Sequence, residues 1–150
     1  MIREVPDKFK MHPEDVKVLF LDVEGVLNPY FGKGETTRCG MMCVAKLNRL
    51  RTVCEHTKCK VVLTSHLREN ENDLRLLKLD GLHWDDVTPV TGQGRRADIE
   101  AWLQANPEIK RFAVIDDDPG AWSGGQNFVL TDMAYGLQET EMTKLIQLLS

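Results

Sequence analysis

No stretch of this 150-residue sequence approaches the roughly 20 consecutive apolar residues that a membrane-spanning helix needs. The first six residues, Met1 to Pro6, also lack the basic and then apolar order of a secretory signal peptide. These absences argue against any association with a membrane. They lead us to expect a cytoplasmic location.

Positive charge is scarce as well. The chain has 19 Lys and Arg against 23 Asp and Glu, which gives a formal net charge of -4. A general nucleic-acid-binding protein usually carries a basic face, so this balance argues against that class. A local basic patch around Arg95 and Arg96 remains open.

Cysteine is limited to positions 39, 43, 54 and 59, and none of these positions forms a CxxC pair. This spacing does not match a structural zinc site, and we predict free thiols. The hydrophobic share of 42% and the charged share of 28% are ordinary for a globular protein. We therefore expect one domain over residues 17–150, preceded by a polar arm at 1–16.

Three short apolar runs each end in polar residues. They are Val18–Leu21 before Asp22, Val61–Leu63 before Thr64-Ser65, and Phe112–Ile115 before Asp116-Asp117-Asp118. Such runs predict buried parallel strands, and ligands in open α/β sheets bind beyond the carboxyl ends of the strands. The sequence therefore predicts one site that is built from strand ends.

Strands and helices alternate along the rest of the chain. We predict strands at about 17–22, 59–64, within 84–90, 111–115 and 127–131, and helices at about 40–55, 69–78, 95–105 and 138–149. Residues 23–38 have the composition of a loop, and Gly120 to Gly125 form a second one. This order predicts an α/β fold with a parallel sheet of about five strands and helices on both faces.

The residue types at these strand ends suit phosphate chemistry. Asp22 could attack phosphorus as a nucleophile, and Asp116 with Asp117 could hold the magnesium ion that offsets the negative charges. Glu24 lies two residues after Asp22 and could act as general acid and then as general base. Glu24 could equally be a solvated loop residue.

Two further elements could bind the phosphate of the substrate. The Ser65 hydroxyl could donate to a phosphoryl oxygen, or it could simply cap the next helix. Arg95 or Arg96, at the start of a predicted helix, could bind phosphate oxygens through a guanidinium group, or could be solvated. We interpret His66 as a loop histidine, because no nucleophile–base pair is evident around it.

Taken together, these residues resemble the haloacid dehalogenase (HAD) superfamily. The matching motifs are Asp22-Val23-Glu24-Gly25-Val26, Thr64-Ser65, Arg95 and Asp116-Asp117. The chain is most similar to the HAD domain of Swiss-Army-knife RNA-repair proteins, on five segments. These are Asp22 to Asn28, Thr88-Pro89, Gly94 to Leu103, Val114 to Asp118 and Thr131 to Leu137.

The resemblance implies a Rossmannoid three-layer sandwich and a magnesium-dependent phosphatase that works through an aspartyl-phosphate. It implies catalytic roles for Asp22, Glu24, Ser65 and Arg95, and metal binding by Asp22, Asp116 and Asp117. It also implies that Glu24 binds the metal through its backbone carbonyl. The second aspartate of the family motif is Glu24 here, which puts turnover in question. The alternative is therefore a catalytically impaired module that binds phosphate, metal or a partner.

The resemblance also bears on the substrate. Many HAD enzymes carry a cap domain after the first strand, whereas residues 23–38 of this chain can form only a short flap. An open site is similar to that of HAD phosphatases acting on large substrates, such as phosphoproteins or nucleic-acid ends. A homodimer partner could also cover the site.

Overall fold

The computed structural model describes residues 15–28 and 34–150 of the protein. The strands are β1 (Lys17–Leu21), β2 (Lys60–Leu63), β3 (Asp86–Val87), β4 (Arg111–Asp116) and β5 (Phe128–Leu130). The α-helices are α2 (Val44–Thr57), α3 (Glu71–Leu79), α4 (Arg95–Ala105) and α5 (Glu139–Leu149). Two short 3₁₀ helices, η2 (His66–Glu69) and η3 (Pro119–Ala121), follow β2 and β4.

The five strands form one parallel sheet in the order β3-β2-β1-β4-β5. The chain runs outward from β1 to β3 and then crosses to β4 on the other side of β1. The strand order therefore reverses beside β1, where the ends of β1 and β4 diverge into separate loops. This doubly wound α/β arrangement, with helices on both faces, confirms the predicted HAD-like fold and places a binding crevice at the ends of β1 and β4.

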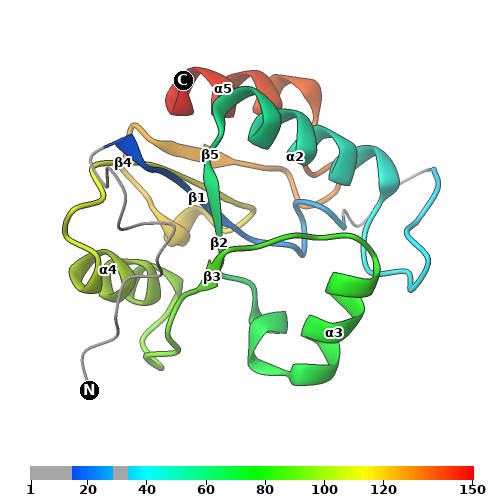
Figure 1. Cartoon of the computed structure of the whole chain (residues 1–150), viewed down its shortest axis with the longest axis horizontal. Helices are drawn as coiled ribbons and strands as arrows, with labels where there is room; N and C mark the ends of the chain where they lie inside the picture. Colours follow the sequence, from blue (N-terminus) through cyan, green and yellow to red (C-terminus); the bar gives the residue numbers. More distant parts are fainter. Residues whose placement is uncertain (1–14, 29–33) are drawn as a thin grey trace.

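Alternation along β1 divides the core into two layers. Leu19 and Leu21 pack into a cluster with residues of α2, α3 and α5, whereas Val18 and Phe20 pack on the other face against α4. Figure 1 shows α2 and α5 side by side above the sheet and α4 below it. Because both faces are covered, β1 is apolar at nearly every position, as expected for a strand buried on both sides.

Helix α2 begins at Val44, four residues later than the predicted start at 40. Gly40 has a φ of +77° and closes a turn in which its N–H donates to the Thr37 carbonyl. The Asp80 carboxylate stabilises this turn, because it accepts from the Thr37 hydroxyl (2.6 Å) and from the Cys39 N–H (2.6 Å). Asp80 comes from the end of α3, so this contact could not be read from the local sequence.

Residues 22–43 connect β1 to α2. Within this connection Glu24 forms a β-bridge with Asn28, and Thr36 forms one with Cys43. The rest of the predicted flap, residues 29–33, and most of the predicted arm, residues 1–14, lie outside the described residues. None of the helices described here combines the length and the apolar character needed to cross a bilayer.

Candidate active site

The ends of β1 and β4 bring two buried aspartates together. Leu21 lies opposite Ile115 in the sheet, and the N–H of Asp22 donates to the Ile115 carbonyl at 3.2 Å. Asp116 is the last residue of β4, so the two acids leave the sheet side by side. Asp22 is 2% exposed and Asp116 is fully buried.

Asp117 completes a group of three acids. Carboxylate oxygens of Asp22, Asp116 and Asp117 lie within 4.8 Å of one another. Gly25 allows Asp117 to reach this position, because a Cβ built on Gly25 would lie 2.6 Å from the Asp117 Cγ. Gly25 also has a φ of +75°, which favours glycine for a second, independent reason.

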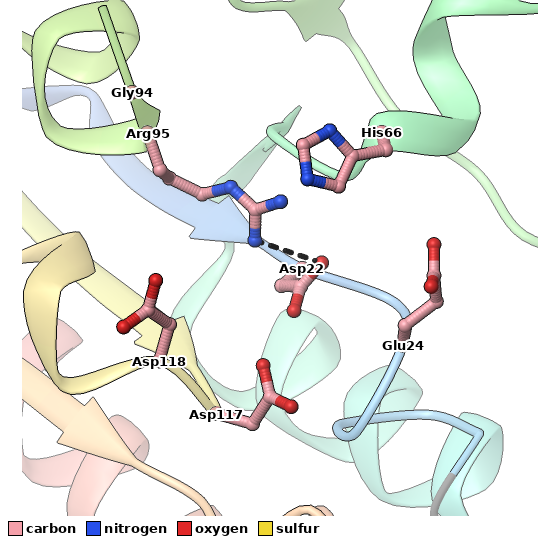
Figure 2. A pocket seen from close by; sticks show the side chains of 7 residues that line it. All are labelled: Asp22, Glu24, His66, Gly94, Arg95, Asp117 and Asp118. Atoms are coloured by element: carbon pink, nitrogen blue, oxygen red, sulfur yellow. Dashed lines mark ion pairs between the residues drawn. The ribbon is translucent and has the colours of Figure 1, made fainter.

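Arg95 projects from the first turn of α4 into this group. Its Nη1 lies 2.7 Å from Asp116 Oδ2 and 3.1 Å from Asp22 Oδ1, and its side chain is 12% exposed. Burial opposes the charged guanidinium, but the Asp22 and Asp116 carboxylates outweigh it and raise the pKa of Arg95 above its ordinary value. Figure 2 shows the Arg95 guanidinium directed at Asp22.

The two buried acids are poor acids in the absence of a bound cation. The pKa of Asp22 is raised to about 8, mainly by burial and secondly by the charge of Asp116. Burial also raises the pKa of Asp116, although Arg95 opposes this. Any further positive charge at the group would favour the ionised carboxylates.

Asp22, Arg95 and Asp117 line one pocket of about 350 Å³. Its walls are Asp22, Glu24, His66, Gly94, Arg95, Asp117 and Asp118. Glu24 is exposed, and its carboxylate is not a member of the group of three acids. In Figure 2 Glu24 and His66 lie on one side of the pocket and Asp118 on the other.

The structure does not bring Ser65 into this pocket. Its side chain is fully buried and caps η2, where it accepts from the N–H of Leu67 at 3.2 Å. This is the capping alternative left open by the sequence. The neighbouring Thr64 hydroxyl is buried and has no hydrogen-bond partner among the described residues. Thr64 directly follows β2. Of the two hydroxyls at this strand end, that of Ser65 caps η2, whereas that of Thr64 is unpaired within the described part of the chain.

Arg96 also lies away from the pocket. Its Nε pairs with Glu100 at 2.9 Å, its Nη1 donates to the Ser123 carbonyl at 2.9 Å, and its guanidinium carbon is 4.8 Å from the centre of the Trp122 ring. Of the two arginines, only Arg95 contacts the acids. The sequence could not separate them, because both begin the same helix.

His66 is the pocket residue that sequence reasoning missed. It begins η2 directly after Ser65, and its Nδ1 lies 3.3 Å from Glu69 Oε2. Figure 2 shows its ring turned toward the Arg95 side chain. The one available signal was its position three residues after the end of β2, where polar residues converge on the sheet edge.

The group of three acids fits a divalent cation. When Asp22, Asp116 and Asp117 are ionised, the single guanidinium of Arg95 leaves two negative charges uncompensated. Carboxylate oxygens are hard ligands of the kind that magnesium prefers. The residues that would hold the ion are therefore Asp22, Asp116 and Asp117.

A comparison with protein-family models matches residues 18–142 to the HAD domain in Swiss Army Knife RNA repair proteins. Neither the curated proteins nor the solved structures gave a match. The matched range covers β2 to β5 and all of β1 except Lys17, and it includes Asp22, Arg95, Asp116 and Asp117.

Proposed function

Because the chain belongs to the family of the HAD domain in Swiss Army Knife RNA repair proteins, we propose that it is a magnesium-dependent phosphomonoester hydrolase. The observation that carries this proposal is the meeting of Asp22 with Asp116, Asp117 and Arg95 at the ends of two neighbouring strands. A carboxylate nucleophile, a cation site and a guanidinium within one pocket are the parts that aspartyl-phosphate chemistry needs.

In the first step a carboxylate oxygen of Asp22 bonds to phosphorus as the bond from phosphorus to the leaving oxygen breaks. Glu24 then acts as general acid and gives its proton to the leaving alcohol. In the second step water attacks phosphorus, Glu24 takes the proton, and the bond to Asp22 breaks. The products are the alcohol and inorganic phosphate, and both side chains return to their initial states.

Arg95 supports this chemistry through its position. Its guanidinium lies beside Asp22, where it could bind an oxygen of the phosphoryl group that Asp22 attacks. When bound, magnesium would neutralise carboxylate and phosphoryl charge and so lower the pKa of Asp22 toward the ionised, nucleophilic form. The partly exposed Glu24 side of the pocket is free to receive the leaving group.

The short connection between β1 and α2 supports a large substrate. Residues 22–43 are too few to form an independently folded cap domain, since domains usually have at least about 50 residues. A pocket without a cap is accessible to a phosphate on a macromolecule, such as a nucleic-acid end or a phosphoprotein. Activity on both kinds of substrate should be compared.

The test is turnover of an aryl phosphate by the purified protein with and without magnesium. We expect magnesium-dependent release of phosphate, and we expect Asp22→Asn to reduce it by at least about a thousandfold while the circular dichroism spectrum is retained. Turnover that survives in Asp22→Asn would exclude the aspartyl-phosphate mechanism.

A second candidate is a module that binds metal or phosphate without turnover. The observation in its favour is Glu24, whose longer side chain replaces the family aspartate and whose carboxylate lies outside the group of three acids. A protein that binds magnesium but hydrolyses no phosphomonoester, even as Glu24→Asp, would support this candidate.

A further inference from the structure

The guanidinium of Arg68 is buried, and its hydrogen bonds join η2 to α4 and to the segment before it. Arg68 lies in η2, and its side chain is only 2% exposed. Its N–H groups donate to four backbone carbonyls and one carboxylate, which belong to Thr64, Ser65, Thr88, Pro89 and Asp98. The shortest of these contacts is 2.6 Å, from Nη2 to Asp98 Oδ2. A buried guanidinium with this number of acceptors is held in one orientation.

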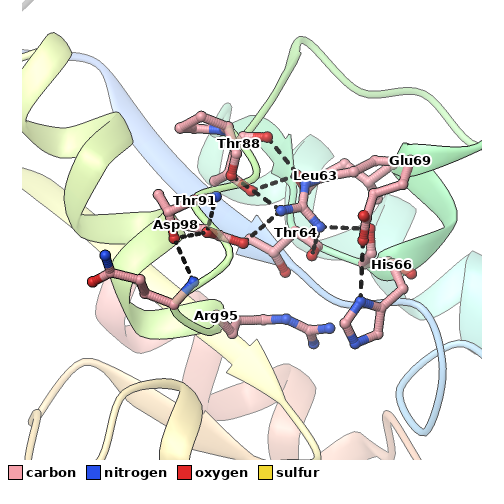
Figure 3. Close-up of polar contacts among 12 residues, drawn as sticks. Leu63, Thr64, His66, Glu69, Thr88, Thr91, Arg95 and Asp98 are labelled. Carbon is pink, nitrogen blue, oxygen red and sulfur yellow. Dashed lines mark hydrogen bonds and ion pairs between the residues drawn. The ribbon is translucent and has the colours of Figure 1, made fainter.

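Asp98 carries the connection from Arg68 into α4. Its Oδ2 pairs with Arg68, and its Oδ1 accepts both the N–H (2.9 Å) and the hydroxyl (2.6 Å) of Thr91 (Figure 3). Asp98 is 7% exposed and lies three residues after Arg95 in the first turn of α4. One carboxylate thus joins η2, the loop before α4 and the helix turn that carries Arg95.

The loop before α4 contains two glycines in the left-handed region of φ. Gly92 and Gly94 have φ values of +77° and +104°, and a Cβ built on either residue would meet no atom within 4 Å. The Gln93 N–H donates to the Thr91 hydroxyl at 3.1 Å, so this loop contact also depends on the residue that Asp98 holds. The polar contacts of Asp98 therefore tie this loop to the first turn of α4.

We infer that the Arg68–Asp98 ion pair is a positioning device that sets Arg95 against Asp22 and Asp116. Arg95 contacts these acids at 2.7 and 3.1 Å, and a hydrogen bond is lost once the atoms separate beyond about 3.5 Å. A shift of the first turn of α4 by about 1 Å is enough to break the contacts, and displacements of this size are costly in catalysis. The catalytic consequence rests on the proposed function, whereas the placement of Arg95 does not.

Two substitutions test the inference directly. Asp98→Asn keeps the shape of the side chain and an acceptor for Thr91 but removes the charge that faces Arg68. Arg68→Lys keeps the charge but replaces the planar, five-donor group by a single ammonium. The matched control is Thr57→Val, which removes a buried hydroxyl that donates to the Val53 carbonyl at 2.8 Å, near the opposite end of β2.

The first measurement is the crystal structure of each variant. We expect the distance from Arg95 Nη1 to Asp116 Oδ2 to exceed 3.5 Å in Asp98→Asn and Arg68→Lys and to stay near 2.7 Å in Thr57→Val. An Arg95 that keeps both of its contacts in the two test variants would overturn the inference, whether or not the protein is an enzyme. A test variant that does not fold is replaced by Arg68→Gln, which removes the ion pair but keeps a planar donor group, and the same change in the Arg95 contact is expected.

The second measurement is a double-mutant cycle on orthovanadate affinity in the presence of magnesium. Asp98→Asn should weaken binding at least tenfold in the wild-type background and less than twofold in the Arg95→Met background. Asp98→Asn should change the melting temperature by a similar amount in the wild-type and Arg95→Met backgrounds. Equal losses of affinity in the two backgrounds would mean that Asp98 does not act through Arg95. A wild type that binds no orthovanadate would instead count against the proposed function.

Discussion

Gly25 lies so close to Asp117 that a methyl group on its Cα would overlap the Asp117 carboxyl group, 2.6 Å from its Cγ. The loop after β1 and the loop after β4 are therefore in direct contact through these two residues. This contact constrains the distance between Asp22, in the loop after β1, and Asp117, in the loop after β4. The absence of a side chain at position 25 is thus a requirement of the site.

Gly25→Ala should lower magnesium affinity at least tenfold, because the added Cβ pushes Asp117 away from Asp22 and Asp116. Isothermal titration calorimetry measures the effect. Gly34→Ala is the control, since Gly34 also has a positive φ, +120°, but a Cβ there would meet nothing within 4 Å. Both variants carry backbone strain, and only the first displaces a metal ligand. Equal magnesium affinities in the two variants would contradict this account.

The raised pKa of Asp22 predicts how the stability of the metal-free protein changes with pH. In the unfolded chain Asp22 loses its proton near pH 3.8, whereas in the fold it keeps the proton up to about pH 8. Between these values the folded state holds more protons, so stability falls as pH rises, by up to about 1.4 kcal/mol per pH unit for one group.

Asp22→Asn removes this titration. We expect the variant to gain stability relative to the wild type as pH rises from 5 to 8 in the presence of a chelator, measured by urea unfolding. Magnesium should reduce the difference, because it binds the ionised carboxylate of the wild type. A difference that does not change between pH 5 and 8 would mean that Asp22 is ionised in the metal-free fold.

Glu24→Asp should change turnover in a way that depends on the leaving group. If Glu24 is a displaced general acid, the shorter aspartate restores the family motif and raises kcat, most for alkyl phosphates whose leaving groups need a proton. Aryl phosphates need it least and serve as the internal control. A wild type that is faster than Glu24→Asp on alkyl phosphates would show that the glutamate is itself the suited acid.

His66→Ala should raise KM by several-fold with little change in kcat, because His66 lines the pocket but does not belong to the group of acids. His83→Ala is the matched control. Both histidines are exposed and lie near a carboxylate, Glu69 at 3.3 Å and Asp85 at 3.1 Å. Steady-state kinetics on one substrate compare them. A similar change of KM in both variants would show that His66 does not contact the substrate.

Much of the fold could be predicted from the sequence because strands buried on both faces have a strong local signature. Val18 to Leu21 and Phe112 to Ile115 are apolar at every position and end at acids, and the structure places both runs in the centre of the sheet. Parallel strands then place Asp22 and Asp116 at the same edge, whatever the details of the loops. The acidic run after the second of these strands added Asp117, and the start of the predicted helix added Arg95 or Arg96.

Only the tertiary structure decided which side chains turn into the pocket. Arg95 and Arg96 begin the same helix, and the packing of α4 directs the first to Asp22 and the second to Trp122. Adjacent residues of a helix point about 100° apart, so a rotation of α4 by about this angle would bring Arg96 to the place of Arg95. The sequence fixes the spacing of these residues but not the rotation of the helix.

Tertiary contacts also decided the structure of the segments after β2 and before α2. Ser65 caps η2 and His66 faces the pocket because the chain turns into a 3₁₀ helix there, and the contacts of Arg68 stabilise this turn. The late start of α2 depends on Asp80, which lies more than 35 residues further along the chain than the turn it stabilises. By itself the sequence determined the strands, their acidic ends and the family. Contacts between residues distant in the chain determined the orientation of each side chain, because local patterns carry no information about such contacts.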